Sequence, residues 1–134
     1  MDRLKERLSI ARQALETLLE VLKEPRTRIV RDASIQRFEY SFEAVWKAAQ
    51  LYLRTVESLE VGSPKAVVRA GLQLGLLNER QTRTALEMAD DRNLTVHTYN
   101  EELAEKIYSR LGGYAALMDH RLRAMEVSYE HPKP

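Results

Sequence analysis

The sequence of 134 residues contains no cysteine, only five glycines and four prolines, and no long uncharged apolar run. Without cysteine the chain forms neither a disulfide nor a thiolate zinc site, and it has no cysteine nucleophile. No segment approaches the roughly 18 apolar residues that a transmembrane helix needs. Four of residues 1–6 are charged, unlike the apolar start of a signal peptide. We therefore expect a soluble, cytoplasmic protein of one domain with no membrane contact.

Neither sign of charge dominates, because 21 Lys and Arg side chains face 20 Asp and Glu, which gives a net charge of +1. This balance is not that of a dedicated nucleic-acid coat protein, although it permits a small basic site. The scarcity of glycine and proline beside abundant Ala, Leu, Glu and Arg favours helix over strand. The three histidines are scattered, and no metal motif or phosphate-binding glycine loop is present, so we expect no metal and no cofactor.

Apolar residues at helical spacing predict two long helices in the first half of the chain. The first covers residues 4–22 and stops before Pro25. The second has the more regular spacing over residues 35–59, with Asp32 or Ser34 as its N-cap. Two amphipathic helices joined by a short loop are expected to pack antiparallel.

Two shorter helices are predicted after this long pair. Ser63 followed by Pro64 is typical of an N-cap and a first helical residue, and Gly75 of a helix end. Asn78 and Gln81 have the spacing of a capping box, which predicts a second short helix as far as about Ala89.

A last long helix is expected to begin near Asn100. Gly112 and Gly113 lie inside it, so either the helix kinks there or another backbone approaches closely. Residues 130–134 are expected to form a disordered tail. Together these patterns predict an all-α, up-and-down four-helix-type bundle with a short helix pair before the last long helix, as a single domain over residues 1–129.

Polar side chains are concentrated in residues 90–100, where only two of the eleven side chains are aliphatic. Arg92 offers a fixed fork of donors to phosphate oxygens, and His97 can exchange a proton near neutral pH. Asn93 adds an amide and Tyr99 a hydroxyl. The segment therefore predicts a site for a phosphodiester or a nucleotide. An ordinary polar junction between two helices, in which Arg92 only pairs with a nearby aspartate, is the alternative.

A second candidate for RNA contact is the basic run over residues 23–37. It holds five cations against Glu24 and Asp32, a net charge of +3 that could steer a phosphate backbone. We single out Arg28 and Arg31 within it as RNA-binding or nucleotide-binding candidates. A solvated loop is the simpler interpretation of such a run.

The pattern Arg92-x4-His97-x-Tyr99 resembles the signature of the HEPN superfamily. More closely, it resembles the substrate-binding partners of minimal nucleotidyltransferases and the HepT-type toxins. Residues 37–47 support this, because they are similar to the helix-2 pattern of those partner proteins. The likeness covers roughly residues 4–111.

The resemblance implies a homodimer that works beside a separate minimal nucleotidyltransferase. It also implies metal-independent RNA cleavage, with His97 as general acid or base, Arg92 stabilising the charged phosphorane, and Asn93 orienting His97 or a phosphate oxygen. Tyr99 occupies the position that the partner enzyme of HepT-like toxins modifies with AMP, which silences the toxin. Arg92 and His97 would lie about 140° apart on a straight helix, so a kinked site or one shared between two copies suits them better.

Two other interpretations remain open. In the first, the chain has no activity of its own and is a non-catalytic nucleotide-binding or substrate-binding subunit of the nucleotidyltransferase, with Arg92 and His97 as ligands. In the second, the chain is a purely structural dimer in which the motif only caps a helix. Endoribonuclease activity is therefore an expectation from the resemblance, and the residues alone do not assign it.

Overall fold

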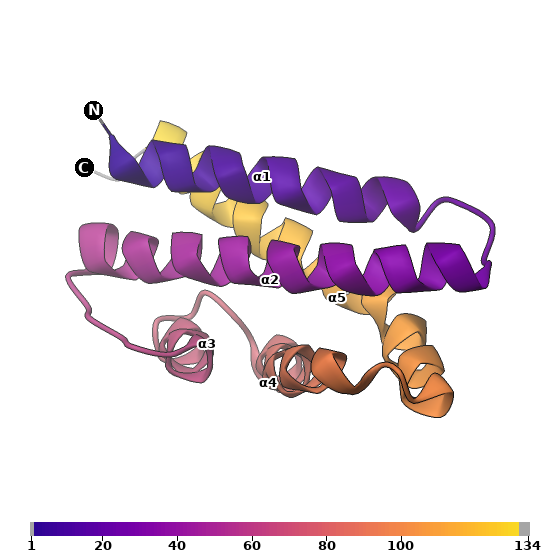
Figure 1. The fold of residues 1–134 in the computed structure, drawn as a ribbon. Coiled ribbons are helices and arrows are strands. Elements are labelled where there is room, and N and C mark those ends of the chain that lie inside the picture. The colour runs from indigo at the N-terminus through magenta and orange to yellow at the C-terminus, as the bar shows by residue number, and fades with distance from the viewer. Residues whose placement is uncertain (1, 132–134) are drawn as a thin grey trace.

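The computed structural model describes residues 2–131 (Figure 1). Within this range the regular structure is helical throughout and contains no strand, so the all-α prediction is confirmed. The elements in chain order are α1 (Arg3–Val21), α2 (Arg28–Glu57), α3 (Pro64–Gln73), α4 (Glu79–Leu94), the short 3₁₀ turn η1 (Thr95–His97) and α5 (Glu101–Glu130).

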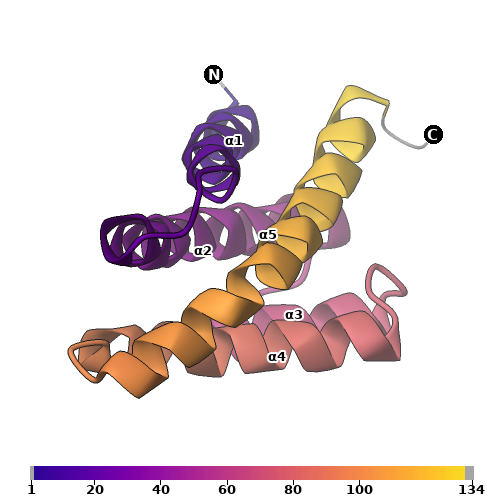
Figure 2. The same cartoon turned by 90° about the vertical axis from the view of Figure 1, so that its right-hand side faces the viewer.

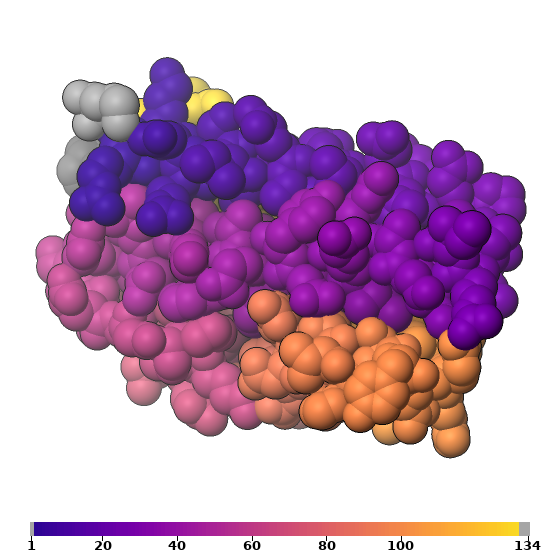
Figure 3. Space-filling model, in the orientation of Figure 1, coloured from indigo at the N-terminus to yellow at the C-terminus, as the bar shows by residue number. Residues whose placement is uncertain are grey.

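The three long helices form the body of the molecule, and the short pair covers one side of it. α1 and α2 lie antiparallel as expected, and α5 crosses both obliquely (Figures 1 and 2). α3 and α4 pack against α2 and α5 on the side away from α1 (Figure 2). In the space-filling view the surface around η1 adjoins that of α2 (Figure 3). Among the helices of residues 2–131, none combines the length and the apolar character of a membrane-spanning segment.

The core lies where α1, α2 and α5 meet. Leu15 and Leu18 of α1 are completely buried, as are Phe38 of α2 and Leu111 of α5. Phe38 stacks on Tyr114 with ring centroids 5.6 Å apart. Each such side chain contributes about 1.5–3 kcal/mol of burial free energy. The core therefore comes from the apolar series that predicted these helices.

The predicted N-cap of α2 is wrong. Thr27, in extended backbone, caps the helix by accepting a hydrogen bond from Val30 N at 3.0 Å. Ser34 instead lies within the helix and donates to Val30 O at 2.6 Å, while Asp32 accepts from Arg31. The regular apolar spacing begins only at Ile35, because the two apolar residues of the first turn lie outside the buried stripe: Ile29 is 81% exposed and Val30 is partly buried. Periodicity alone therefore placed the start too late.

The predicted caps of the two short helices are confirmed. Ser63 accepts from Ala66 N at 3.2 Å, and Pro64 is the first residue of α3. Gly75, just beyond the end of α3, has a φ of +74°, a left-handed conformation that glycine adopts without strain. Asn78 and Gln81 form the reciprocal capping box expected at the start of α4.

α4 continues to Leu94, five residues beyond its predicted end at Ala89, because a buried carboxylate holds it against α5. Asp91 is only 3% exposed. Its oxygens lie 3.0 and 3.1 Å from Arg110 Nη1 and 2.5 Å from the donating hydroxyl of Tyr114. These contacts satisfy a charge that burial would otherwise make costly. We call Asp91, Arg110 and Tyr114 the Asp91 clamp.

α5 begins at its predicted cap, with Asn100 Oδ1 accepting from Leu103 N at 3.1 Å. It passes through Gly112 and Gly113 without interruption. No heavy atom of the residues that the structure describes lies within 4 Å of the Cβ position built at either glycine, so the close backbone approach is wrong. α5 includes Glu130, the first residue of the expected tail, and residues 132–134 of that tail lie outside the described range.

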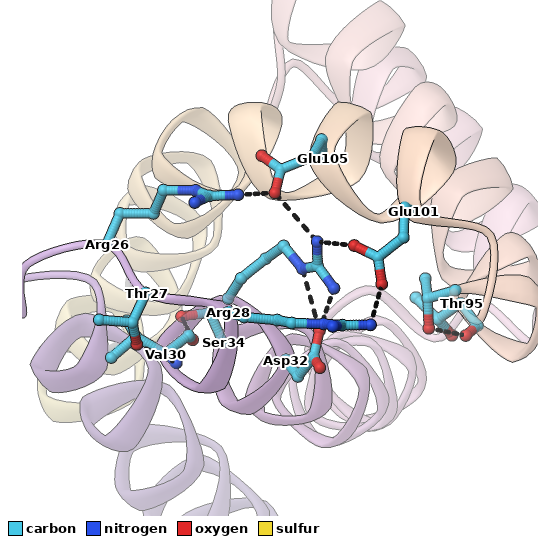
Figure 4. Close-up of polar contacts among 11 residues, drawn as sticks. Arg26, Thr27, Arg28, Val30, Asp32, Ser34, Thr95, Glu101 and Glu105 are labelled. Carbon is cyan, nitrogen blue, oxygen red and sulfur yellow. Dashed lines mark hydrogen bonds and ion pairs between the residues drawn. The ribbon is translucent and has the colours of Figure 1, made fainter.

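Ion pairs tie the start of α2 to the start of α5 (Figure 4). Arg31 is 2% exposed, and its Nη1 donates to Glu101 at 2.6 Å and to Glu105 at 3.0 Å. Its Nη2 lies 2.9 Å from Asp32 Oδ1. Because Glu101 is the first residue of α5, this network fixes the point at which the chain leaves η1.

Removing the Tyr114 hydroxyl tests the Asp91 clamp. We expect Tyr114→Phe to lower the free energy of unfolding by about 1–3 kcal/mol, because it keeps the buried ring but leaves the Asp91 carboxylate short of a donor. Urea unfolding followed by circular dichroism measures the change. Tyr108→Phe, at a partly buried ring of the same helix whose hydroxyl has no hydrogen bond within residues 2–131, is the control. Equal losses in both variants would contradict the clamp.

The Arg31 network makes stability depend on pH. The hydrogen bond from Arg31 holds the pKa of Glu101 below its ordinary value of 4.5. A carboxyl group whose pKa is lower in the folded state stabilises the fold above its unfolded pKa, and this contribution is lost as the pH falls through the folded pKa. Glu101→Gln should therefore lower the urea midpoint at pH 7, and the difference from wild type should shrink progressively below about pH 4.5.

The neighbouring Glu102 is the control for this experiment. It is exposed, lies in the same first turn of α5, and has no ion pair among the described residues. Glu102→Gln should produce the smaller difference at pH 7. A pH-independent difference for Glu101→Gln, or equal effects of the two variants, would show that the network does not stabilise the fold.

Candidate functional site

The motif residues lie where α4 ends and α5 begins. Arg92 and Asn93 belong to the last turn of α4, His97 closes η1, and Tyr99 immediately precedes Asn100, the N-cap of α5 (Figure 1). The Arg31 network places this junction beside the start of α2, at the end of the bundle away from the start of α1. The motif is therefore a helix-to-helix corner rather than one straight helix.

Threonine hydroxyls shape this corner. Thr95 is buried, and its Oγ1 donates to Arg92 O at 2.7 Å, which satisfies a carbonyl at the end of α4. Thr98 Oγ1 donates in the same way to Thr95 O at 2.8 Å. Asn100 N then donates to His97 O at 3.0 Å before α5 starts. These bonds reverse the chain direction through the short 3₁₀ turn η1. The side chains of Val96, His97 and Tyr99 are exposed to solvent.

His97 and Tyr99 are the two motif side chains that the structure brings together. The Tyr99 hydroxyl lies 3.4 Å from His97 Nδ1, a long hydrogen bond whose donor depends on the tautomer of the imidazole. The two rings meet edge to face with centroids 5.9 Å apart. His97 is exposed, and Tyr99 is 82% exposed, which is unusual for a side chain of this size. Both can be reached by a large partner.

Arg92 is not paired with a neighbouring aspartate. Asp90 is bonded to Lys65 at 2.6 Å, and Asp91 to Arg110. Arg92 Nε is buried and has no hydrogen-bond acceptor within residues 2–131. A buried donor without an acceptor costs free energy, so Arg92 brings an unused donor to this corner. The alternative in which it merely balances an aspartate of the junction is wrong.

One copy of the chain does not gather the whole motif. Among the hydrogen bonds of residues 2–131, none joins Arg92 to His97 or to Tyr99. Asn93 is exposed on the last turn of α4 and likewise has no bond to His97. The described part of the chain also contains no group of three or more His, Cys, Asp or Glu side chains that could hold a metal ion.

The basic run over residues 23–37 is largely neutralised by acids from α5. Arg31 is buried against Glu101 and Glu105, and Arg26 pairs with Glu105. Arg28 lies 2.6 Å from Glu101, although 73% of its side chain is exposed. The run therefore does not present the net +3 that its own residues suggest. The compensating acids lie about seventy positions away in the sequence, beyond the reach of a local count.

Two exposed apolar side chains lie within the motif segment, and a third lies at the start of α2. Val96 is 67% exposed, Leu94 40%, and Ile29 at the start of α2 is 81% exposed. In the sequence, Leu94 and Val96 are the two aliphatic exceptions of this polar segment. Exposed apolar side chains that form one patch favour contact with another protein.

Known proteins are similar to this chain in sequence and in fold. A probable ribonuclease HepT from Haemophilus influenzae is 29% identical over 85 residues, which cover 60% of this chain and 57% of that protein. The match thus spans little more than half the length of that relative. A crystal structure of a protein from Thermus thermophilus superposes with a TM-score of 0.83 at 53% identity, covering 86% of this chain and 98% of the other.

A second solved structure, from Haemophilus influenzae, is described as revealing the fold of a substrate-binding domain of a nucleotidyltransferase. It superposes with a TM-score of 0.75, covering 89% of this chain and 98% of the other, and its 19% identity shows likeness of fold alone. A family model described as nucleotidyltransferase substrate binding protein like matches residues 6–127, which is most of the chain. This chain belongs to the nucleotidyltransferase substrate-binding protein family.

Proposed function

We propose that this chain is the partner of a separate minimal nucleotidyltransferase, and that the corner around η1 is where the two proteins act on each other. The observation that carries the proposal is the exposure of Tyr99, 82%, on a rigid corner beside His97. A hydroxyl that another enzyme modifies must be accessible to that enzyme's active site. The exposed Val96 beside it supplies apolar surface for the contact.

The proposed modification is transfer of AMP to Tyr99. The Tyr99 oxygen attacks the α-phosphorus of ATP, the bond from that phosphorus to the bridging oxygen breaks, and pyrophosphate leaves. The hydroxyl proton must go to a base, and His97 Nδ1 at 3.4 Å is close enough to accept it once the pair tightens. The product carries added bulk and negative charge at the corner.

The activity that this modification would regulate is metal-independent RNA cleavage. The 2′-hydroxyl of the RNA attacks the adjacent phosphate, which yields a cyclic phosphate and releases the 5′-oxygen with a proton. His97 would move the proton, the unpaired Arg92 would stabilise the phosphorane, and Asn93 would orient an oxygen. An AMP group on Tyr99 would occupy the space that an RNA phosphate needs.

Two copies of the chain suit this reaction better than one. No hydrogen bond joins Arg92 and His97 within residues 2–131 of one copy, whereas a homodimer meeting at the exposed Leu94 and Val96 would place the arginine of one copy near the histidine of the other. Apolar side chains at the centre with charged groups around them are typical of such interfaces.

A second function is supported by the description of the matched family as substrate-binding proteins. In this alternative the chain cleaves nothing and holds a nucleotide or substrate for the nucleotidyltransferase, with Arg92 on a phosphate. The absence of an Arg92–His97 hydrogen bond within the described residues of one copy suits a ligand site as well as a shared catalytic site.

RNA cleavage by the purified chain tests the nuclease. We expect cleavage to persist in EDTA and to fall by a factor of roughly 10²–10⁴ in His97→Ala, because a general acid or base is lost. His120→Ala, at an exposed histidine of α5, should leave the rate unchanged. If His97→Ala cleaves as fast as wild type, the nuclease is excluded.

Titration with ATP, with Arg92→Ala as the comparison, then tests the binding alternative.

Modification of Tyr99 is tested with the cognate nucleotidyltransferase and ATP. We expect intact-protein mass spectrometry to show one added AMP group on the wild type and none on Tyr99→Phe. Tyr40→Phe, which alters another exposed tyrosine on α2, should accept AMP normally. An adduct of equal yield on Tyr99→Phe would rule out Tyr99 as the acceptor.

A further inference from the structure

Arg121 of α5 is a buried cation without a carboxylate partner. It is 8% exposed, and no ion pair or hydrogen bond of its guanidinium is found within residues 2–131. Its central carbon lies 5.5 Å from the centroid of the Tyr52 ring. The other buried arginine, Arg31, is bonded by three acids. Burial lowers the pKa of Arg121 from its ordinary value, which reflects the cost of holding this charge away from water.

The Tyr52 ring offers the Arg121 guanidinium a cation–π contact but no hydrogen-bond acceptor. An aromatic ring attracts a cation electrostatically, but it does not accept the N–H groups of a guanidinium as a carboxylate does. The Tyr52 hydroxyl is itself bonded to Ser128 at 2.9 Å. A guanidinium with free donors in an apolar environment favours an anionic acceptor with two oxygens in one plane.

Arg121 lines a cleft that is otherwise almost entirely apolar. The cleft has a volume of about 60 Å³ and lies where the short pair α3 and α4 packs on α2 and α5. Figure 1 shows α3 and α4 side by side below α2. The cleft lies between this pair and α2 and α5, because residues of all four helices line it. Its walls include Trp46 from α2, Val67 from α3, Met88 from α4 and Leu117 from α5.

We infer that this cleft binds a small amphipathic carboxylate, with its carboxylate on Arg121 and its aliphatic part against Val67, Met88 and Leu117. The charge of Arg121 selects an anion, and the apolar walls select a short hydrocarbon group attached to it. The cleft shares no residue with the motif at η1, so the inference stands independently of the proposed function.

The size of the cleft limits the ligand. A cavity of about 150 Å³ in an apolar core binds benzene, and this cleft offers less than half that space. The cleft opens to solvent, so the ligand need not be wholly enclosed. The part that enters the cleft must be smaller than a phenyl ring, as in a branched chain of a few carbon atoms. Isovalerate has both features, and two analogues separate them: isovaleramide lacks the charge and acetate lacks the hydrocarbon group.

Calorimetric or NMR titration of the full chain with these three compounds tests the inference. We expect isovalerate to bind with a dissociation constant at least about tenfold below that of isovaleramide or acetate, since it alone satisfies both parts of the site. Saturable binding should disappear in Arg121→Met, which keeps the apolar volume, and persist in Arg123→Met, an exposed arginine of the same helix. Failure of isovalerate to bind, or equal binding by Arg121→Met, overturns the inference.

A second variant and a stability measurement complete the test. Ala85→Leu fills the cleft while keeping Arg121, and it should weaken isovalerate binding at least about tenfold. Without ligand, Arg121→Met should melt no lower than wild type, because it removes an unpaired buried charge. If Arg121 acts only by packing on Tyr52, Arg121→Met melts lower and Ala85→Leu leaves the titration unchanged, and the ligand site is rejected.

Discussion

The burial of one carboxylate determines how the second half of the molecule is built. Asp91 can lose its contact with water only if α5 supplies donors, and Arg110 and Tyr114 do so from adjacent turns of that helix. The single hydroxyl proton of Tyr114 faces both Asp91 and Glu87, at 2.5 and 2.8 Å. Burial and these carboxylates raise the pKa of Tyr114 far above its ordinary value, so the phenol stays a donor.

The same contacts explain why the motif at η1 is rigid and yet accessible. The Asp91 clamp holds the end of α4, and the Arg31 network holds the start of α5, so the residues between the ends of the two helices have little freedom. Polar groups of the backbone are satisfied by Thr95 and Thr98, which leaves His97 and Tyr99 free to face solvent. Side chains fixed in this way are suited to recognition by another protein or a phosphate.

Sequence reasoning succeeded where local chemistry decides the structure and failed where distant residues do. The caps at Ser63 and Asn78 follow from residues within one turn, and both were predicted correctly. The extension of α4 depends on the contact between Asp91 and Arg110, which is nineteen positions later in the sequence. Residue identity alone does not show whether an aspartate is buried or exposed. Resemblance to a known family identifies the motif from the sequence. The pairing of Arg31 with Glu101 is visible only in the three-dimensional structure, because the two residues are seventy positions apart.

The position of the two solvent-facing glycines of α5 has a consequence for the mobility of the motif. Gly112 and Gly113 lie between Arg110 and Tyr114, the two residues that hold Asp91. Two adjacent glycines make this the intrinsically weakest turn of the helix. Asp91 of α4 binds residues on both sides of this turn and so stabilises it. If this contact is lost, α5 is free to bend at this turn. Loosening α4 would therefore displace the end of α4 and η1, while the Arg31 network still holds the first turn of α5 to α2.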